Sequence, residues 1–286
     1  MPPNKLSGFK KTATAAAILT ALVPLAAQGE AGRVNFTMGE VQATGPDGSK
    51  RALSKGSIVL SGETITTSSG GMAHIRFRDG AYVSLKPNSN FRIDEYRYKE
   101  EKAEESRGFF SLLKGGLRTI TGLIGKQNND SYRMSSEVAT IGIRGTHYEV
   151  DVGEGGKQGK TAVQNYVDSD SIVLKINPEF ELLSGEKAVL QPIFLPDGAS
   201  VVEITLTDRA GEETVYQVDT NGRVRTRGQD DFLSAEESAI LLGERISDPD
   251  SVFSLGDSSD DSAVELGDVI QRELDDLCAS PAPYCG

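Results

Sequence analysis

Residues 73–85 of this chain, AHIRFRDGAYVSL, restrict the possible fold more than any other stretch. Apolar and polar residues alternate on both sides of Asp79-Gly80, which is the period of a strand with one buried face. Two alternating runs joined by a two-residue Asp-Gly link are a strong β-hairpin signal. The stretch therefore predicts a hairpin whose apolar residues face a core.

Similar short runs recur along most of the chain, with turn residues roughly every 8–12 positions, which is typical of all-β domains. We predict a mainly β protein, an all-β domain of solenoid-like or sandwich character. The main domain is expected at residues 34–193. Residues 194–228 hold a smaller set of strands, either an extension of the main sheet or a satellite. Gly115-Gly116 predicts a further turn.

The N-terminus has the pattern of a secretory signal. Lys5, Lys10 and Lys11 precede an apolar run at 12–27, and small residues follow that run. A positive region, a short apolar region and a small-residue cleavage site are the parts of a signal peptide. We expect residues 1–31 to be this signal, with an uncleaved anchor as the alternative, because the run is short for a membrane span.

The negative charge of the chain lies at its C-terminus. Residues 229–286 carry 15 Asp and Glu against 2 Arg and no Lys, which accounts for the net charge of −12 of the whole chain. Residues 234–237 have capping-box spacing, and so do residues 262–265. The second segment places Leu266, Ile270, Leu274 and Leu277 on one helical face. We predict a short acidic tail, partly disordered, with two short helices.

The two cysteines of the chain, Cys278 and Cys285, lie close together in this tail. Export would place them in an oxidising compartment, where such a pair forms a small disulfide ring. Free or intermolecular thiols are the alternative.

Residues 138–150, VATIGIRGTHYEV, read as two short strands that meet at a glycine. Alternation places Ile141 and Ile143 on one face before Gly145, where the apolar face must be re-aimed. We expect a structural corner made by six residues, Ile141, Gly142, Ile143, Arg144, Gly145 and Thr146. Arg144 is expected to be a structural cation in this corner.

After the glycine, His147, Glu149 and Asp151 share one strand face, opposite Tyr148 and Val150. Imidazole and carboxylates suit divalent metals, so these three residues form the strongest metal hypothesis in the chain. The alternative, which we prefer, is the solvent face of a half-buried strand.

Other chemistries have weaker support. Residues 153–161, GEGGKQGKT, end in Gly-Lys-Thr but lack the glycine spacing of a phosphate loop, because Glu154 stands where the first glycine would be needed. The chain has two histidines, His74 and His147, so catalytic triads have few possible members. The sequence shows no basic stripe, which argues against nucleic acid. We expect no catalytic residues and no metal or other cofactor.

Four stretches together resemble FecR-type domains, the family named after a periplasmic regulator of iron-dicitrate signalling. They are residues 59–68 (VLSGETITTS), 73–85 (AHIRFRDGAYVSL), 112–126 (LLKGGLRTITGLIGK) and 139–150 (ATIGIRGTHYEV). The resemblance covers residues 34–193. It implies an exported all-β domain without catalysis. Members that regulate iron uptake carry a cytoplasmic segment and a membrane span ahead of this domain, whereas here the domain follows directly on the expected signal.

The resemblance and the residues together predict a non-enzymatic, exported FecR-domain module in the periplasm or outside the cell. We expect it to bind a protein or cell-envelope partner, with a role in sensing or regulation. No nucleic acid and no membrane span after signal cleavage are expected. A structural or adhesin-like surface component is the alternative function.

Overall fold

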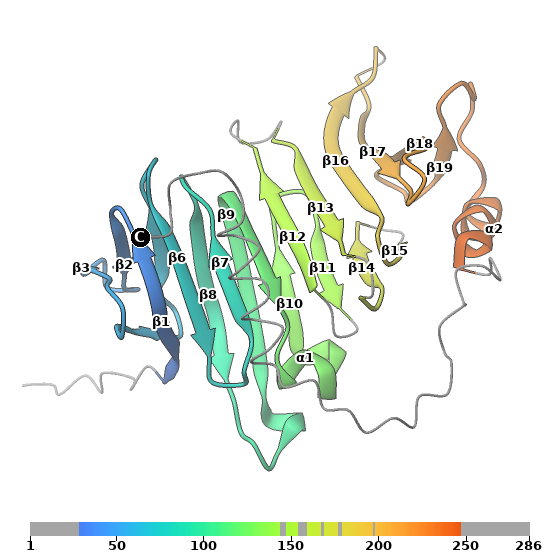
Figure 1. Ribbon diagram of the computed structural model, residues 1–286. Coiled ribbons are helices and arrows are strands. Elements are labelled where there is room, and N and C mark those ends of the chain that lie inside the picture. Colours follow the sequence, from blue (N-terminus) through green and yellow to red (C-terminus); the bar gives the residue numbers. More distant parts are fainter. Residues whose placement is uncertain are drawn as a thin grey trace, which may run out of the picture.

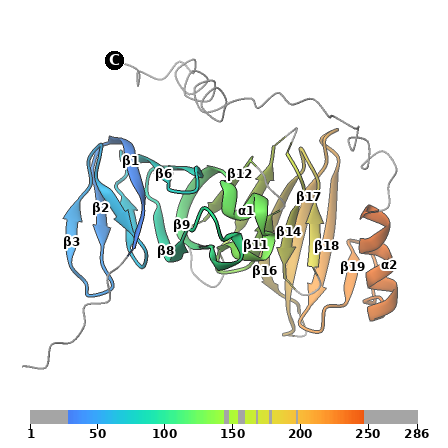
Figure 2. The same ribbon diagram turned by 90° about the horizontal axis from the view of Figure 1, so that it is seen from below.

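The computed structural model describes residues 29–143, 147–153, 159–166, 169–176, 179–196 and 198–246. Their strands form an elongated body in which the chain advances from β1 at one end to β19 at the other (Figures 1 and 2). The strands make two sheets, here called sheet A and sheet B, which share one long strand. The predicted mainly β fold is confirmed.

Sheet A runs in the order β4 (Ile58–Leu60), β1 (Glu30–Met38), β6 (Met72–Phe77), β7 (Tyr82–Leu85), β9 (Arg107–Ile120), β12 (His147–Val152), β13 (Thr161–Asn165), β16 (Lys187–Phe194), β17 (Ser200–Thr207), β18 (Glu213–Asp219) and β19 (Val224–Thr226). All of these pairs are antiparallel. Residues 194–228 thus extend this sheet through β17, β18 and β19.

Sheet B runs in the order β3 (Lys50–Ala52), β2 (Val41–Thr44), β5 (Thr64–Thr67), β8 (Asn90–Arg97), β9, β10 (Tyr132–Ser135), β11 (Thr140–Ile143), β14 (Ile172–Lys175) and β15 (Glu179–Leu182). The β9–β10 pair is parallel and the others are antiparallel. Short helical segments are η1 (Ala103–Glu105), α1 (Leu123–Gln127), η2 (Asn129–Ser131) and α2 (Ala235–Ile246).

Strand β9 passes from one sheet to the other at Gly115. Its first half pairs with β8 in sheet B, and its second half pairs with β7 and β12 in sheet A. Gly115 has φ +81°, and a Cβ there would lie 2.5 Å from the Cα of Ser89. The predicted turn at Gly115-Gly116 is therefore wrong, because the strand bends here and continues in the second sheet.

The core lies between the two sheets and is built from the inward residues of alternating strands. Phe91, Ile93 and Leu112 of sheet B are fully buried, as are Leu117 and Tyr148 of sheet A. The ring of Phe110 contacts the rings of Phe77, Phe91 and Tyr132, with centroids 5.2–5.7 Å apart. Such rings remove a large apolar area from water, which stabilises the two-layer arrangement.

The hairpin predicted at residues 73–85 is formed by β6 and β7, with Ala73 opposite Leu85. Gly80 has φ +87° at the turn, a backbone conformation that glycine adopts without strain. The Asp79 carboxylate is buried and accepts hydrogen bonds from the Tyr96 hydroxyl (3.0 Å) and from the amide of Ile124 in α1 (3.3 Å). The turn thereby fixes the segment that follows β9.

Helix α2 starts with the capping box that the sequence predicts. The Glu237 amide donates to Ser234 Oγ (3.2 Å), and the Ser234 amide donates to the Glu237 carboxylate (2.9 Å). Within the described ranges, no helix is long and apolar enough to span a membrane. The signal at residues 1–31 lies almost wholly outside the described residues, as do the tail after residue 246 with Cys278 and Cys285, and Arg144, Gly145 and Thr146.

Candidate functional site

The described part of the expected corner motif lies in β11, the third strand from the β15 end of sheet B. Ile141 and Ile143 are buried in the core, as their alternation predicts. Gly142 is at an outward position of β11 and pairs with Val173 of β14. A Cβ at Gly142 would lie 3.7 Å from both Lys175 Cε and the Val173 carbonyl oxygen, which is ordinary contact. Packing therefore leaves room for a side chain at this position.

The room beside Gly142 belongs to a hollow of about 830 Å³ on the outer side of sheet B. We call it the β11 groove. Residues 126–130, in and between α1 and η2, line it together with nine strand residues from five strands, Phe109, Tyr132, Arg133, Thr140, Gly142, Ile143, Val173, Lys175 and Glu179. The groove is the larger of the two hollows described here.

Cationic side chains and one aromatic ring shape the β11 groove. The Arg133 guanidinium lies 4.3 Å from the centre of the Phe109 ring, a cation–π contact. Lys175 pairs with Glu179 at 3.4 Å. Among the described residues, neither Lys126 nor Arg133 forms an ion pair. The groove therefore offers two cations without an ion pair among the described residues, beside the carboxylates of Asp130 and Glu179 that also line it.

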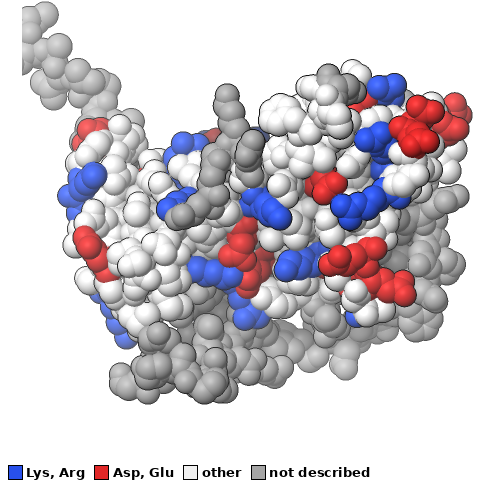
Figure 3. Space-filling view, turned by 90° about the horizontal axis from the view of Figure 1, so that it is seen from above, with Lys and Arg blue, Asp and Glu red and all other residues white. Residues whose placement is uncertain are grey.

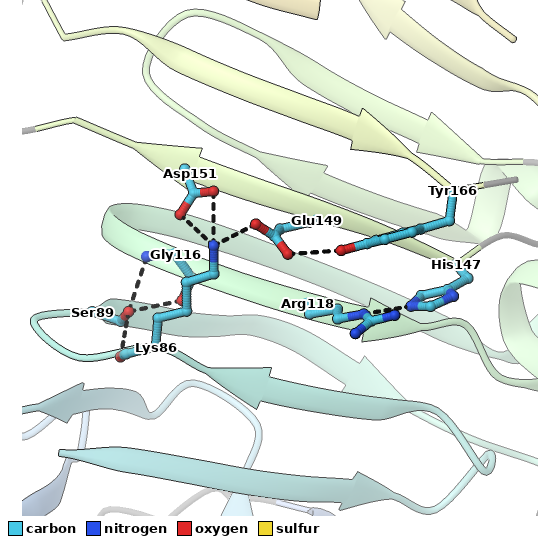
Figure 4. A network of polar contacts seen from close by, with 8 residues as sticks. All are labelled: Lys86, Ser89, Gly116, Arg118, His147, Glu149, Asp151 and Tyr166. Atoms are coloured by element: carbon cyan, nitrogen blue, oxygen red, sulfur yellow. Dashed lines mark hydrogen bonds and ion pairs between the residues drawn. The ribbon is translucent and has the colours of Figure 1, made fainter. Parts of the chain in front are cut away.

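A second polar cluster lies on the outer face of sheet A, where β12 presents the three residues of the metal hypothesis (Figure 4). We call it the β12 network. The Lys86 ammonium sits between two carboxylates, bonding both oxygens of Asp151 at 2.9 Å and also Glu149. Tyr166 of the loop after β13 donates its hydroxyl to Glu149 at 2.9 Å.

The same network holds His147. Arg118 of β9 donates from Nε to His147 Nε2 at 2.7 Å. The His147 ring is stacked on Tyr166, with centroids 4.3 Å apart and an angle of 16° between the planes. The Arg118 guanidinium lies 4.4 Å from the centre of the same Tyr166 ring. The alternation predicted for His147, Glu149 and Asp151 is confirmed, because all three lie on the outer face.

The polar groups of the β12 network satisfy one another. Burial raises the pKa of Glu149, but the adjacent Lys86 outweighs it and holds the pKa below its usual range. Burial lowers the pKa of Lys86, but its hydrogen bonds to both carboxylates raise the pKa overall. The cations thus occupy the places that a metal would need between these ligands. No group of three His, Cys, Asp or Glu suited to a metal is found in the described ranges.

A smaller hollow of about 270 Å³ adjoins this network and is lined by Glu149, Asp151, Ala162, Gln164, Tyr166 and Lys187. Strand β13 follows the 153–161 segment, so the Gly-Lys-Thr sequence leads into a strand and not into the helix that a phosphate loop requires. Residues 154–158 of that segment lie outside the described ranges.

Charges of both signs are mixed on the face drawn in Figure 3, and Lys and Arg form no continuous stripe there. This distribution gives no electrostatic footprint for nucleic acid on that face.

Sequence reasoning missed most partners of both clusters. Lys86 precedes Glu149 by 63 positions, and Arg118 precedes His147 by 29. No local pattern links such residues, because strand pairing across β7, β9 and β12 brings them together. Phe109 and Arg133 likewise meet through the parallel β9–β10 pair, which the sequence did not predict.

Comparison with known proteins places a family match on this part of the chain. Residues 63–167 match the family described as "FecR protein". Two crystal structures, at 1.65 and 2.50 Å resolution, of a "putative anti-sigma factor" from Parabacteroides distasonis ATCC 8503 are similar, with TM-scores of 0.35 and sequence identities of 14% and 13%. The similarity covers 63% and 49% of this chain, which spans 65% and 58% of those chains, less than two thirds.

No curated protein matches the chain. The family match begins in the turn before β5 and ends just after β13, so it includes β9, the described part of the corner motif and the β12 network. The resemblance seen in the sequence is thereby confirmed over residues 63–167, which match the FecR family.

Proposed function

We propose that this chain is an exported, non-catalytic regulatory module that binds a protein partner through the β11 groove. The observation that carries the proposal is the contrast between the two polar clusters. The cations of the β12 network are matched by carboxylates or bound to rings within the fold. Lys126 and Arg133 line an open groove without an ion pair among the described residues.

The chemistry of the β11 groove suits an acidic protein segment. Arginine and aromatic residues are enriched at protein interfaces, where they supply much of the binding energy. Arg133 held against Phe109 loses less freedom on binding than an extended arginine would, because the ring already orients it. Gly142 lets a partner backbone approach the sheet closely. A partner with a carboxylate at Arg133 fits these features.

A non-catalytic role agrees with the FecR domain, whose family is regulatory. In the β12 network, Lys86 and Arg118 already engage Glu149, Asp151 and His147. A general base accepts a substrate proton on a free lone pair, and these bonds engage the groups of the network that could serve as one. A regulatory role by contact with another protein requires no such group.

Photo-crosslinking in cells tests the binding site. A crosslinker at Thr140, in the β11 groove, is expected to capture a discrete protein. The variant Arg133→Glu is expected to abolish this capture. The matched control is a crosslinker at Thr205, a strand position on the outer face of sheet A paired with Val189 and Val215. Equal capture of the same protein from Thr205, or capture that survives Arg133→Glu, would show that the groove is not the binding site.

Export has its own test. The positive region and apolar run before residue 28 support cleavage close to the first strand, β1. N-terminal sequencing of the mature protein is expected to begin within residues 28–32, and cell fractionation is expected to place it in the periplasm or the medium. A mature protein that begins at Met1 and stays in the cytoplasm would exclude export.

A further inference from the structure

An apolar patch lies on the outer face of sheet A, beside the β12 network. We call it the β1–β7 patch and define it by Phe36, His74, Tyr82 and Ile120. Phe36 lies opposite His74 in the β1–β6 register, and Tyr82 lies opposite Ile120 in the β7–β9 register. The His74 ring lies between Phe36 and Tyr82, with centroids 5.1 and 5.6 Å apart. Phe36 is 41% exposed, whereas Tyr82 and Ile120 are only 6% and 8% exposed.

The patch is separate from the core. The inward neighbours Ala73, Ile75 and Val83 belong to the core between the sheets, whereas Tyr82 and Ile120 do not. In Figure 1, α1 lies at the lower end of the sheets and α2 lies beside β19, so neither of these helices covers β1, β6 and β7. Side chains of such low exposure, on a face that neither helix covers, call for an occupant.

His74 gives a second sign of an occupant. It is 5% exposed, and neither ring nitrogen has a hydrogen-bond partner in the described part of the chain. Buried polar atoms are rarely left without a partner, because each one loses its hydrogen bonds to water. Burial lowers the pKa of His74, so its ring is neutral at neutral pH and suits an apolar contact. One ring nitrogen then still needs an acceptor for its hydrogen.

We propose that residues 262–277 of this chain dock on the β1–β7 patch as an amphipathic helix. Their sequence, SAVELGDVIQRELDDL, begins with capping-box spacing and places four apolar residues on one face, Leu266, Ile270, Leu274 and Leu277. This apolar face covers the patch. The five acidic residues of the segment face the cations at its border and supply an acceptor for His74.

Charge supports this occupant. Residues 262–277 carry five Asp and Glu against one Arg. Arg76 and Arg78, on and just after β6 beside the patch, are exposed. Attraction between these groups orients the segment on the face and adds to the burial of its apolar side.

The chain is long enough for this contact. Helix α2 ends at Ile246 beside β19, and the walk from β19 to β6 across sheet A passes β18, β17, β16, β13, β12, β9 and β7. At about 4.8 Å per strand this distance is about 38 Å. Residues 247–261 reach about 50 Å when extended. The connection therefore suffices without any rearrangement of the strands.

Intramolecular photo-crosslinking of the purified full chain tests the contact. In the variant Phe36→benzoylphenylalanine, we expect the crosslinked peptide to come from residues 262–277 of the same molecule. The matched control replaces Phe194, which is 67% exposed at the end of β16, with the same amino acid. Phe194 is expected to yield several-fold less adduct with residues 262–277.

A second pair of variants tests the face of the helix. The triple variant Leu266→Asp, Ile270→Asp and Leu274→Asp is expected to abolish the Phe36 adduct, whereas Val264→Asp, on the opposite side, is expected to keep it. Equal adducts from Phe36 and Phe194, adducts outside residues 262–277, or an adduct that survives the triple variant would overturn the proposal. A crosslinked dimer would also overturn it and would assign the patch to a second copy. None of these readouts depends on a partner at the β11 groove.

Discussion

The hydroxyl oxygens of Tyr132 and Tyr148 lie 2.6 Å apart in the buried core. Tyr132 belongs to β10 of sheet B and Tyr148 to β12 of sheet A, so this hydrogen bond joins the two sheets. Burial raises the pKa of both tyrosines, which therefore stay neutral and act as neutral donors and acceptors.

Removing either hydroxyl leaves the other one buried without this partner. Tyr148→Phe and Tyr132→Phe should therefore each lower the free energy of unfolding by about 1–3 kcal/mol. Urea denaturation measures both values. The double variant should lower the free energy of unfolding by less than the sum of the two single losses. Additive losses would show that the hydrogen bond contributes nothing to stability.

The sheet-to-sheet bend of β9 depends on Gly115. Gly115→Ala is expected to destabilise the protein by about 3 kcal/mol or more, because the Cβ would meet the Ser89 backbone at 2.5 Å and the residue would keep φ +81°. Gly211→Ala is the matched control, since Gly211 has φ +85° and open space around it. It should cost only about 1 kcal/mol. Thermal and urea unfolding measure the difference, and equal losses would exclude the contact with Ser89 as the cause.

Tyr96 ties the β6–β7 turn to the rest of the fold. Its hydroxyl accepts from the Asp79 amide at 2.9 Å and donates to the Asp79 carboxylate at 3.0 Å, all within the buried interior. Tyr96→Phe should therefore cost about 2 kcal/mol of unfolding free energy, because it leaves a buried amide unsatisfied. Tyr98→Phe, two residues later, should change it by less than about 0.5 kcal/mol. A similar loss for both variants would contradict this role.

The Lys86–Glu149 pair is expected to make stability depend on pH. The pKa of Glu149 is lowered by folding, so its contribution is present above the unfolded value near 4.5 and is lost as the pH falls through the folded value. Lys86→Met should lower the free energy of unfolding by about 1 kcal/mol at pH 7, a small loss because the pair is partly exposed. The loss should be smaller at pH 3. Lys102→Met breaks an exposed pair with Glu105 and should change little at either pH. A pH-independent loss for Lys86→Met would show a packing effect.

Gly142 offers a test of the β11 groove that leaves the fold intact. Gly142→Ala should leave the free energy of unfolding within about 1 kcal/mol, because the Cβ has ordinary contacts. Gly32→Ala should destabilise strongly, because its Cβ would lie 2.4 Å from the Arg76 carbonyl oxygen in the neighbouring strand. The larger Gly142→Leu should fold but lose capture of the partner from Thr140. Unfolding by Gly142→Ala would show that the glycine serves the fold and not the groove.

Local pattern was enough for several elements. The β6–β7 hairpin follows from strict alternation and an Asp-Gly link, and α2 begins at the reciprocal bonds of Ser234 and Glu237. The side on which His147 lies follows from the alternation in β12 alone. These features depend on residues within a few positions of one another, so a window of sequence contains their cause.

Gly115 shows where local pattern failed. A glycine pair between apolar runs has the composition of a turn and therefore predicts one here. The sheet-to-sheet bend depends on Ser89, 26 positions away, which packs against Gly115 and whose Oγ accepts a hydrogen bond from the Gly116 amide. The residues next to Gly115 in the sequence do not indicate that contact.

The amino-acid sequence by itself determined that this chain forms short alternating strands, which residues face inward along each strand, and its FecR resemblance. The tertiary structure decided what the outward residues do. His147, Glu149 and Asp151 form a network with Lys86 and Arg118. Beside Gly142 the folded chain forms a groove. The physical reason is range: strand alternation follows from neighbouring backbone geometry, whereas contacts across sheets depend on which distant strands pair.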